Sequence, residues 1–263
     1  MRIAKGSSVS PQSTAAMHAG LAVLLLAAAA RAQDSFEIQV YDAETAPPMT
    51  PGVEIHLNEF VHGTQETSPM GELPTNHVAH LTLEPHLGIT DVFEVGAYLQ
   101  SALRPDGTYD YAGTKLRMKG RLREPAFGWL RLALNGELSI IPKAYEASRW
   151  GGELRPILET RAGQLGLWLN PIISFAFDEG VHPELEPCAK AAWAVTDVLS
   201  LGAEYYAGLG RIESPLPLSE QVHRGFGVLD VATRWFDLNF GVGAGSGPDS
   251  FIVKAIIGVH PPE

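Results

Sequence analysis

The chain has 263 residues, a formal net charge of −11 and a single cysteine, Cys188. The acidic balance argues against a nucleic-acid partner, because binding a polyanion needs clustered positive charge. Cys188 has no second cysteine with which to form an internal disulfide, so an exported chain of this size needs another source of stability. A closed, hydrogen-bonded sheet would supply it.

The N-terminus has the parts of an export signal. Arg2 and Lys5 supply positive charge, residues 21–30 form an unbroken apolar run, and Ala-Arg-Ala at residues 30–32 fits a cleavage site. The apolar run is shorter than the roughly 20 residues that a spanning helix needs. We therefore predict that residues 1–32 are a cleaved signal peptide. Its loss removes three positive charges and no acid, which leaves a net charge near −14.

The next segment, residues 33–51, carries Pro47, Pro48 and Pro51. Prolines at this density favour an extended chain. The alternation at residues 36–41 is compatible with a short strand. We predict an extended N-terminal segment that lies in the periplasm or plugs a lumen.

From residue 52 onward, apolar and polar side chains alternate with a period of two, which is typical of strands and not of amphipathic helices. The clearest case sets Leu116 and Met118 against Lys115 and Arg117. Twelve such runs have lengths near that of a membrane-spanning strand. They cover residues 52–60, 77–87, 92–103, 111–122, 127–141, 150–161, 165–177, 184–195, 198–209, 222–235, 236–244 and 251–260.

The connectors between these runs alternate between short and long along the chain. A Thr-Asp turn, for example, occurs in two of the short connectors, at residues 89–92 and 195–198. Short periplasmic turns and long extracellular loops are typical of outer-membrane barrels. We predict an all-β fold: a single antiparallel up-and-down transmembrane barrel of about 12 strands over residues 52–260, with both termini periplasmic. Its partners would be outer-membrane lipid and the barrel-assembly machinery.

A soluble, exported β-sandwich acting as a binding module is the alternative, since the apolar faces would also suit a sandwich core. The polar faces carry unlike charges at high density, which suits a salt-bridged lumen. Aromatic residues such as Trp129, Trp150 and Trp235 lie near predicted strand ends, where interfacial girdles form. Both features favour the barrel.

Short phrases in the chain resemble the outer-membrane proteins grouped with the phenol-degradation pathway (MetA-type). The strand–turn–strand phrase is carried by residues 87–98, and further similar phrases lie at residues 113–117 and 168–170. The resemblance covers about residues 75–260. It implies an outer-membrane transporter of hydrophobic compounds.

The inward faces supply the candidate lumen-lining residues. The most informative run is the basic face of residues 111–122, where four cations about 6.7 Å apart need acids on neighbouring strands. Two interpretations stay open: a salt-bridge network that closes or narrows the pore, and a charged wall that attracts anionic solutes. The candidates are Lys115, Arg117, Lys119, Arg121, Arg131, Glu94, Glu137, Glu153, Arg155, Glu159, His80, Glu84 and His86.

No cofactor, metal site or enzymatic activity is predicted. His80 and His86 share one strand face but would be about 20 Å apart, too far to bind one ion. The strand serines do not lie in a nucleophile phrase such as G-x-S-x-G. The sequence predicts a narrow pore or transporter for a small solute, either hydrophobic or anionic. The alternative is a closed, non-conducting barrel with a structural or surface-interaction role.

Overall fold

A computed structural model describes residues 34–178, 182–247 and 249–259. The predicted signal peptide, residues 1–32, lies outside these residues. The strands are β1 (Pro51–His62), β2 (Ala79–Thr90), β3 (Phe93–Leu103), β4 (Tyr109–Arg121), β5 (Leu130–Ile140), β6 (Trp150–Ala162), β7 (Leu165–Asn170), β8 (Ile173–Ala176), β9 (His182–Leu185), β10 (Cys188–Ala194), β11 (Leu199–Gly208), β12 (Gly210–Arg211), β13 (Ser214–Pro215), β14 (Val222–Ala232), β15 (Phe236–Gly245) and β16 (Phe251–Val259).

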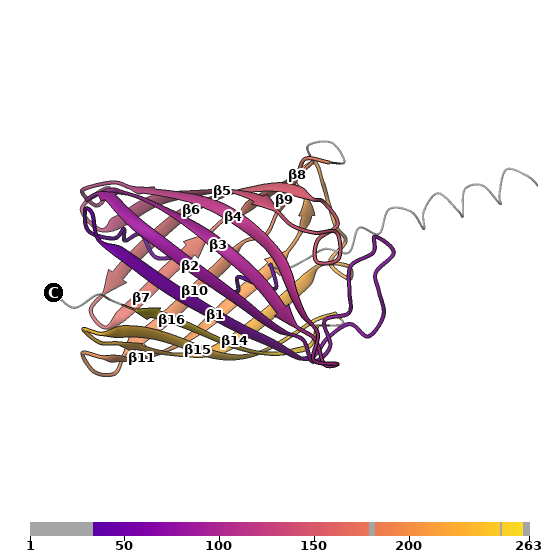
Figure 1. The fold of residues 1–263 in the computed structure, drawn as a ribbon. Coiled ribbons are helices and arrows are strands. Elements are labelled where there is room, and N and C mark those ends of the chain that lie inside the picture. The colour runs from indigo at the N-terminus through magenta and orange to yellow at the C-terminus, as the bar shows by residue number, and fades with distance from the viewer. Residues whose placement is uncertain (1–33, 179–181, 248, 260–263) are drawn as a thin grey trace, which may run out of the picture.

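Twelve of these strands form a closed antiparallel ring (Figure 1). The order is β1-β2-β3-β4-β5-β6-β7-β10-β11-β14-β15-β16, and β16 pairs with β1, with Val53 opposite Val259. A closed ring leaves no edge strand with unpaired backbone groups, so every strand can face lipid without exposing a polar edge. The predicted fold, a twelve-strand antiparallel barrel, is confirmed.

Across the described parts of the chain, the structure contains no helix with the length and apolar character needed to cross a membrane.

Two of the predicted strands, residues 165–177 and 184–195, are each broken into two pieces. β7 ends before Pro171, and β10 begins after Pro187. Proline has no N–H to donate to a ladder, which explains why pairing stops at these positions. Beyond the breaks, β8 pairs with β6 and β9, β9 with β12, and β12 with β13, so these four short strands extend the wall past the ring.

The connector between β4 and β5 is longer than predicted, because residues 127–129 do not belong to the strand. Phe127 and Gly128 have φ values of 54° and 78°. This left-handed backbone is incompatible with a strand. The strand β14 is also shorter than predicted, since it ends at Ala232 and not at residue 235. The Thr233 hydroxyl accepts a hydrogen bond from the Phe236 N–H at 3.0 Å, and this bond closes a turn after the strand.

The predicted orientation of the side chains is confirmed on the strand where it was clearest. On β4, Leu116 and Met118 are 62% and 57% exposed, whereas Lys115 and Arg117 are each 5% exposed. Alternate residues therefore point outward and inward, as the period of two requires.

Exposed aromatic side chains lie at both ends of the barrel wall. Trp129 and Trp235 precede β5 and β15 at one end, and Trp150 opens β6 at the other. Amphipathic rings of this kind favour the two interfaces of a membrane. The apolar band between them is the surface that would contact hydrocarbon.

Replacing Leu116 by arginine should impair folding into a bilayer. A cation at the bilayer midplane on the lipid face costs about 2–4 kcal/mol, and Leu116 lies midway along β4. Urea titration in liposomes, with folded protein scored by its gel mobility before boiling, would measure the loss. Leu116→Phe is the matched control and should fold like the wild type. Equal stability of the two variants would mean that this face does not contact lipid.

Candidate functional site: the barrel lumen

Residues 34–50, here called the N-terminal segment, lie inside the ring of strands. At one end, Phe36 packs with Val78, Ala102 and Ala112, close to the longer loops. At the other, the Met49 N–H donates to the carbonyl of Gly88, next to the β2–β3 turn, at 2.7 Å. The segment therefore crosses the lumen and reverses direction into β1. Asp34 contacts Lys115 near the middle of β4, away from the end at which Val53 pairs with Val259, the last described residue.

The N-terminal segment does not form the short strand considered for residues 36–41. Its backbone bonds to lumen side chains instead of to a ladder. Asn170 accepts the Tyr41 N–H at 2.7 Å and donates to the Tyr41 carbonyl at 3.1 Å. Lys254 donates to the carbonyl of Ile38 at 2.9 Å. Buried backbone groups need such partners, so these wall residues hold the segment in one position.

One side of the lumen contains an apolar cluster. Ile38 from the N-terminal segment is fully buried there, together with wall residues from β1, β10, β11, β14 and β16 and from the β7–β8 junction. The cluster consists of Ile38, Phe60, Ile172, Cys188, Tyr206, Phe226, Val228 and Ile252. This packing gives the segment an apolar anchor in addition to its polar contacts.

The other side of the lumen is charged, and Lys115 lies at its centre. The Nζ atom of Lys115 lies 2.7 Å from Asp34, 3.0 Å from Glu37 and 3.3 Å from Glu137. Two of these three carboxylates belong to the N-terminal segment. A predicted wall cation is therefore neutralised mainly by the chain that fills the lumen.

The next two cations of β4 also pair with acids, one with acids of the wall and the other with an acid of the segment. Arg117 bridges two wall acids, with Nε 2.7 Å from Glu84 and Nη1 2.6 Å from Glu94. Lys119 lies 3.4 Å from Asp42 of the N-terminal segment. Three of the four like charges predicted on this face are therefore paired with carboxylates.

Arg155 on β6 is fully buried. Its guanidinium donates to Glu37 at 2.9 Å and to Glu153 at 2.7 Å, and it lies 4.1 Å from the centre of the Tyr41 ring. Tyr41 also hydrogen-bonds to the hydroxyl of Tyr98. Arg155 thus binds the segment in two ways, through its ion pair with Glu37 and through its cation–π contact with Tyr41.

Towards the short-turn end, Arg131 contacts Glu44 of the segment and lies 3.3 Å from Glu159. Arg121 donates to the Thr45 hydroxyl at 3.0 Å and to the carbonyl of Asp91 at 2.7 Å. These contacts continue the charged side to the end of the barrel.

The two candidate histidines lie in different surroundings. His80 packs edge-on against Phe36 and Phe60, with ring centres 4.6 and 5.0 Å apart. His86 lies over Gly52, where an added Cβ would come 2.3 Å from its Nε2 atom. The structure therefore separates the two histidines, as expected from their spacing.

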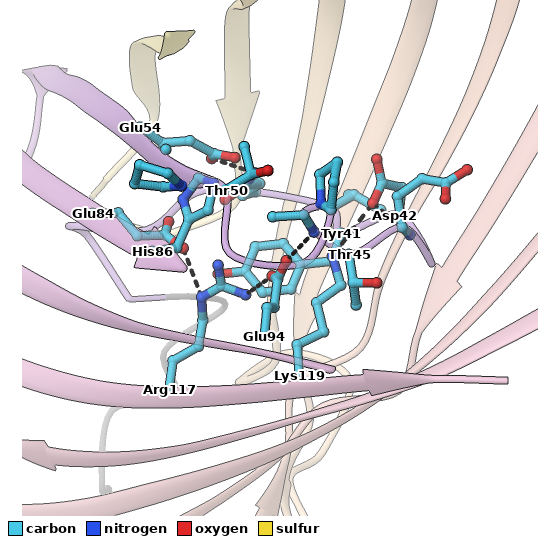
Figure 2. A pocket seen from close by; sticks show the side chains of 17 residues that line it. Tyr41, Asp42, Thr45, Thr50, Glu54, Glu84, His86, Glu94, Arg117 and Lys119 are labelled. Carbon is cyan, nitrogen blue, oxygen red and sulfur yellow. Dashed lines mark hydrogen bonds and ion pairs between the residues drawn. The ribbon is translucent and has the colours of Figure 1, made fainter. Parts of the chain in front are cut away.

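A cavity of about 310 Å³ lies between the segment and the charged wall (Figure 2). Its charged lining consists of Asp42, Glu44, Glu54, Glu84, Glu94, Arg117 and Lys119. Five acids face two bases, so the cavity has an excess of negative charge. A lumen blocked by the segment thus still keeps a polar space large enough for water and small ions.

A second charged group, on β11 and β16, was not identified from the sequence. Lys254 is fully buried and donates to Glu204 at 2.5 Å and to Tyr206 at 3.3 Å. The signal in the sequence was a single lysine between Ile252 and Ile256 on the inner face of the last strand. The prediction for that strand considered only its outer, apolar face.

No protein-family model and no curated protein matches the chain. Among solved structures, an outer membrane channel from Pseudomonas putida F1 is similar, with a TM-score of 0.52 and 11% identity over 85% of this chain and 99% of the channel. The KdgM porin has a TM-score of 0.49 and 9% identity over 81% of this chain and 99% of the porin. Outer membrane phospholipase A from Escherichia coli has a TM-score of 0.44 and 11% identity over 89% and 98%.

The fold is therefore that of the bacterial outer-membrane β-barrels. The likeness to the Pseudomonas putida channel carries this conclusion, and at this identity it extends to the fold alone. A shared fold does not specify a solute or a reaction.

Proposed function

We propose that the protein is a gated conduit for a small solute in the bacterial outer membrane, kept closed by its N-terminal segment. The observation that carries the proposal is the way the segment is held. Its acids Asp34, Glu37 and Asp42 pair with Lys115, Arg155 and Lys119 of the wall. A purely structural barrel has no need to keep so many ionisable groups in its lumen, because buried ion pairs contribute little net stability over an apolar core.

The fold supports the same proposal. Twelve strands enclose a lumen wider than that of eight-stranded barrels, whose side chains fill the interior. Without the segment, this chain would have a polar passage along the charged wall. The resemblance to the phenol-degradation group suggests a hydrophobic solute, whereas the cations of β4 suggest an anionic one.

Loosening the segment should open the pore. In planar bilayers, the wild type should show low conductance with rare openings. The double variant Glu37→Gln/Asn170→Ala should open more often. It removes the ion pair between Glu37 and Arg155 and the hydrogen bonds from the Asn170 side chain to the Tyr41 backbone. Glu213→Gln, on an exposed loop, is the control and should match the wild type. If the wild type and the double variant are both silent while folding correctly, the protein is the closed, non-conducting barrel.

A further inference from the structure

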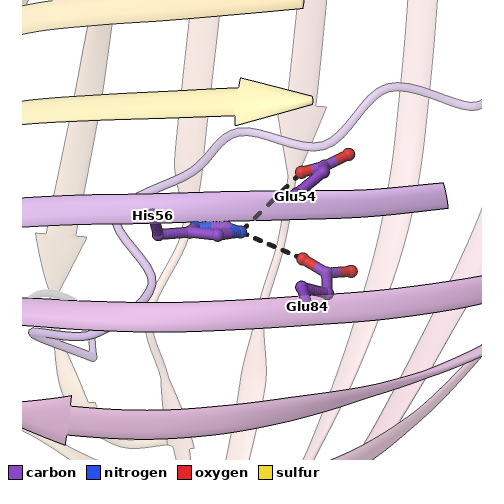
Figure 3. A group of neighbouring side chains, drawn as sticks. All are labelled: Glu54, His56 and Glu84. Atoms are coloured by element: carbon purple, nitrogen blue, oxygen red, sulfur yellow. Dashed lines mark hydrogen bonds and ion pairs between the residues drawn. The ribbon is translucent and has the colours of Figure 1, made fainter. Parts of the chain in front are cut away.

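Three ionisable side chains from β1 and β2 converge next to the cavity (Figure 3). The Nε2 atom of His56 lies 3.0 Å from a carboxylate oxygen of Glu84 and 3.7 Å from one of Glu54. One potential ligand atom from each residue lies within 4.8 Å of the others. The pairing of the two strands creates this group. Glu54 is directly opposite Glu84, and His56 is opposite Thr82, one diagonal step away.

The group has the composition and spacing of a transition-metal site. Bonds of about 2.0–2.2 Å to zinc place tetrahedral ligand atoms about 3.3–3.6 Å apart. The observed distances from His56 Nε2, 3.0 Å to Glu84 and 3.7 Å to Glu54, differ from this range by amounts that small side-chain rotations can absorb. Imidazole nitrogen with carboxylate oxygen suits zinc and related ions, whereas calcium and magnesium prefer oxygen ligands alone. Three protein ligands leave a fourth position for water or another ligand.

The surroundings favour a cation and give it access. Glu54 and Glu84 both line the cavity, which carries more acids than bases. The Glu54 side chain is 29% exposed, so solvent reaches the group, while His56 is fully buried and held in place. Arg117 binds the other oxygen of Glu84, at 2.7 Å from Nε, and orients that carboxylate without covering the oxygen that faces His56.

Gln39 of the N-terminal segment is also part of these surroundings. Its Nε2 atom donates to Glu54 at 3.2 Å. An ion bound here would therefore lie where the segment meets the wall, beside groups from β1, β2, β4 and the segment. The site itself does not depend on whether the lumen conducts.

We propose that Glu54, His56 and Glu84 bind a divalent transition-metal ion of the zinc class, reached through the cavity. The three ligands were not grouped from the sequence, because two of them lie on β1 and the third on β2. The sixteen residues between these strands leave their register open.

Zinc titration of the refolded, chelator-treated barrel by calorimetry would test the site. The wild type should bind one high-affinity Zn²⁺ per barrel. His56→Gln keeps a polar side chain of similar size but loses the imidazole. It should bind at least about tenfold more weakly, since losing even an outer-shell partner weakens metal binding 10–100-fold. Cobalt should give the visible absorption of a low-coordinate nitrogen–oxygen site in the wild type and lose it in the variant.

Two further variants keep the test decisive. Glu54→Gln affects a partly exposed ligand, so the barrel should fold normally and still bind zinc more weakly. His182→Gln, an exposed histidine at the far end of the wall, should bind like the wild type. The proposal is overturned if His56→Gln and Glu54→Gln retain wild-type zinc affinity, or if the wild type binds no zinc. Displacement of zinc by an equal concentration of magnesium would overturn the assigned class of ion.

Discussion

A variant lacking residues 34–46 is expected to conduct several times better than the wild type and to prefer anions. The deletion removes the chain that crosses the lumen, together with its four acids Asp34, Glu37, Asp42 and Glu44. Lys115 then loses two of its three carboxylate partners, and Lys119 loses Asp42. A positive wall concentrates anions, and salt screens the effect, so the preference should weaken as ionic strength rises.

Reversal potentials in a salt gradient measure this preference. In the deleted background, Lys115→Gln/Lys119→Gln should move the selectivity back towards cations, because these two residues lose their acidic partners in the segment and supply the freed positive charge. Glu213→Gln/Glu220→Gln removes two acids from exposed loops and should leave both conductance and selectivity unchanged. A deletion variant that folds, as shown by its gel mobility before boiling, and yet stays silent would show that the segment does not close the pore.

The Arg155→Met variant should lose about 3–5 kcal/mol of unfolding free energy. Arg155 is fully buried and binds Glu37 and Glu153. Removing it leaves these two carboxylates without their shared partner, and breaking a buried ion pair on one side is costly in this range. Urea unfolding in liposomes, followed by the same gel assay, gives the free energy.

Arg123→Met is the matched control for that loss. Arg123 also pairs with a carboxylate, that of Asp91, but its side chain is 66% exposed. An exposed pair contributes only about 0–1 kcal/mol, so this variant should unfold close to the wild type. Adding Glu153→Gln to Arg155→Met should restore part of the stability, since it removes the carboxylate that Arg155 leaves without an ion pair, whereas Glu37 keeps Lys115. Equal losses of unfolding free energy for Arg155→Met and Arg123→Met would mean that solvent screens the lumen ion pairs as strongly as the surface pair.

Much of the barrel could be predicted from the sequence because its physical signal is local. The alternation at Leu116 and Met118 records which side faces lipid, residue by residue. The breaks at Pro171 and Pro187 were also visible as prolines. Their effect depends on which neighbour each half of the strand pairs with, and that is a property of the closed sheet.

The lumen was harder to predict because its contacts join distant parts of the chain. Lys115 and Arg155 were assigned to the inner face, but their partner Glu37 lies 78 and 118 residues away. The four acids of the N-terminal segment were a usable signal of charge complementarity with β4. The group formed by Glu54, His56 and Glu84 had no comparable signal, because a one-residue change of register would separate it.

The hydrogen bonds that hold Tyr41 and Ile38 of the N-terminal segment have a consequence for the order of assembly. Asn170 follows Tyr41 by 129 residues, and Lys254 follows Ile38 by 216 residues, on the last strand of the ring. Contacts between such distant parts of a chain form late, because the intervening loop must first be ordered. The segment gains its full set of anchors only when β16 has joined β1. We therefore expect nascent barrels to pass through a stage with an empty lumen, when a solute or an inhibitor of matching charge could enter before the segment does.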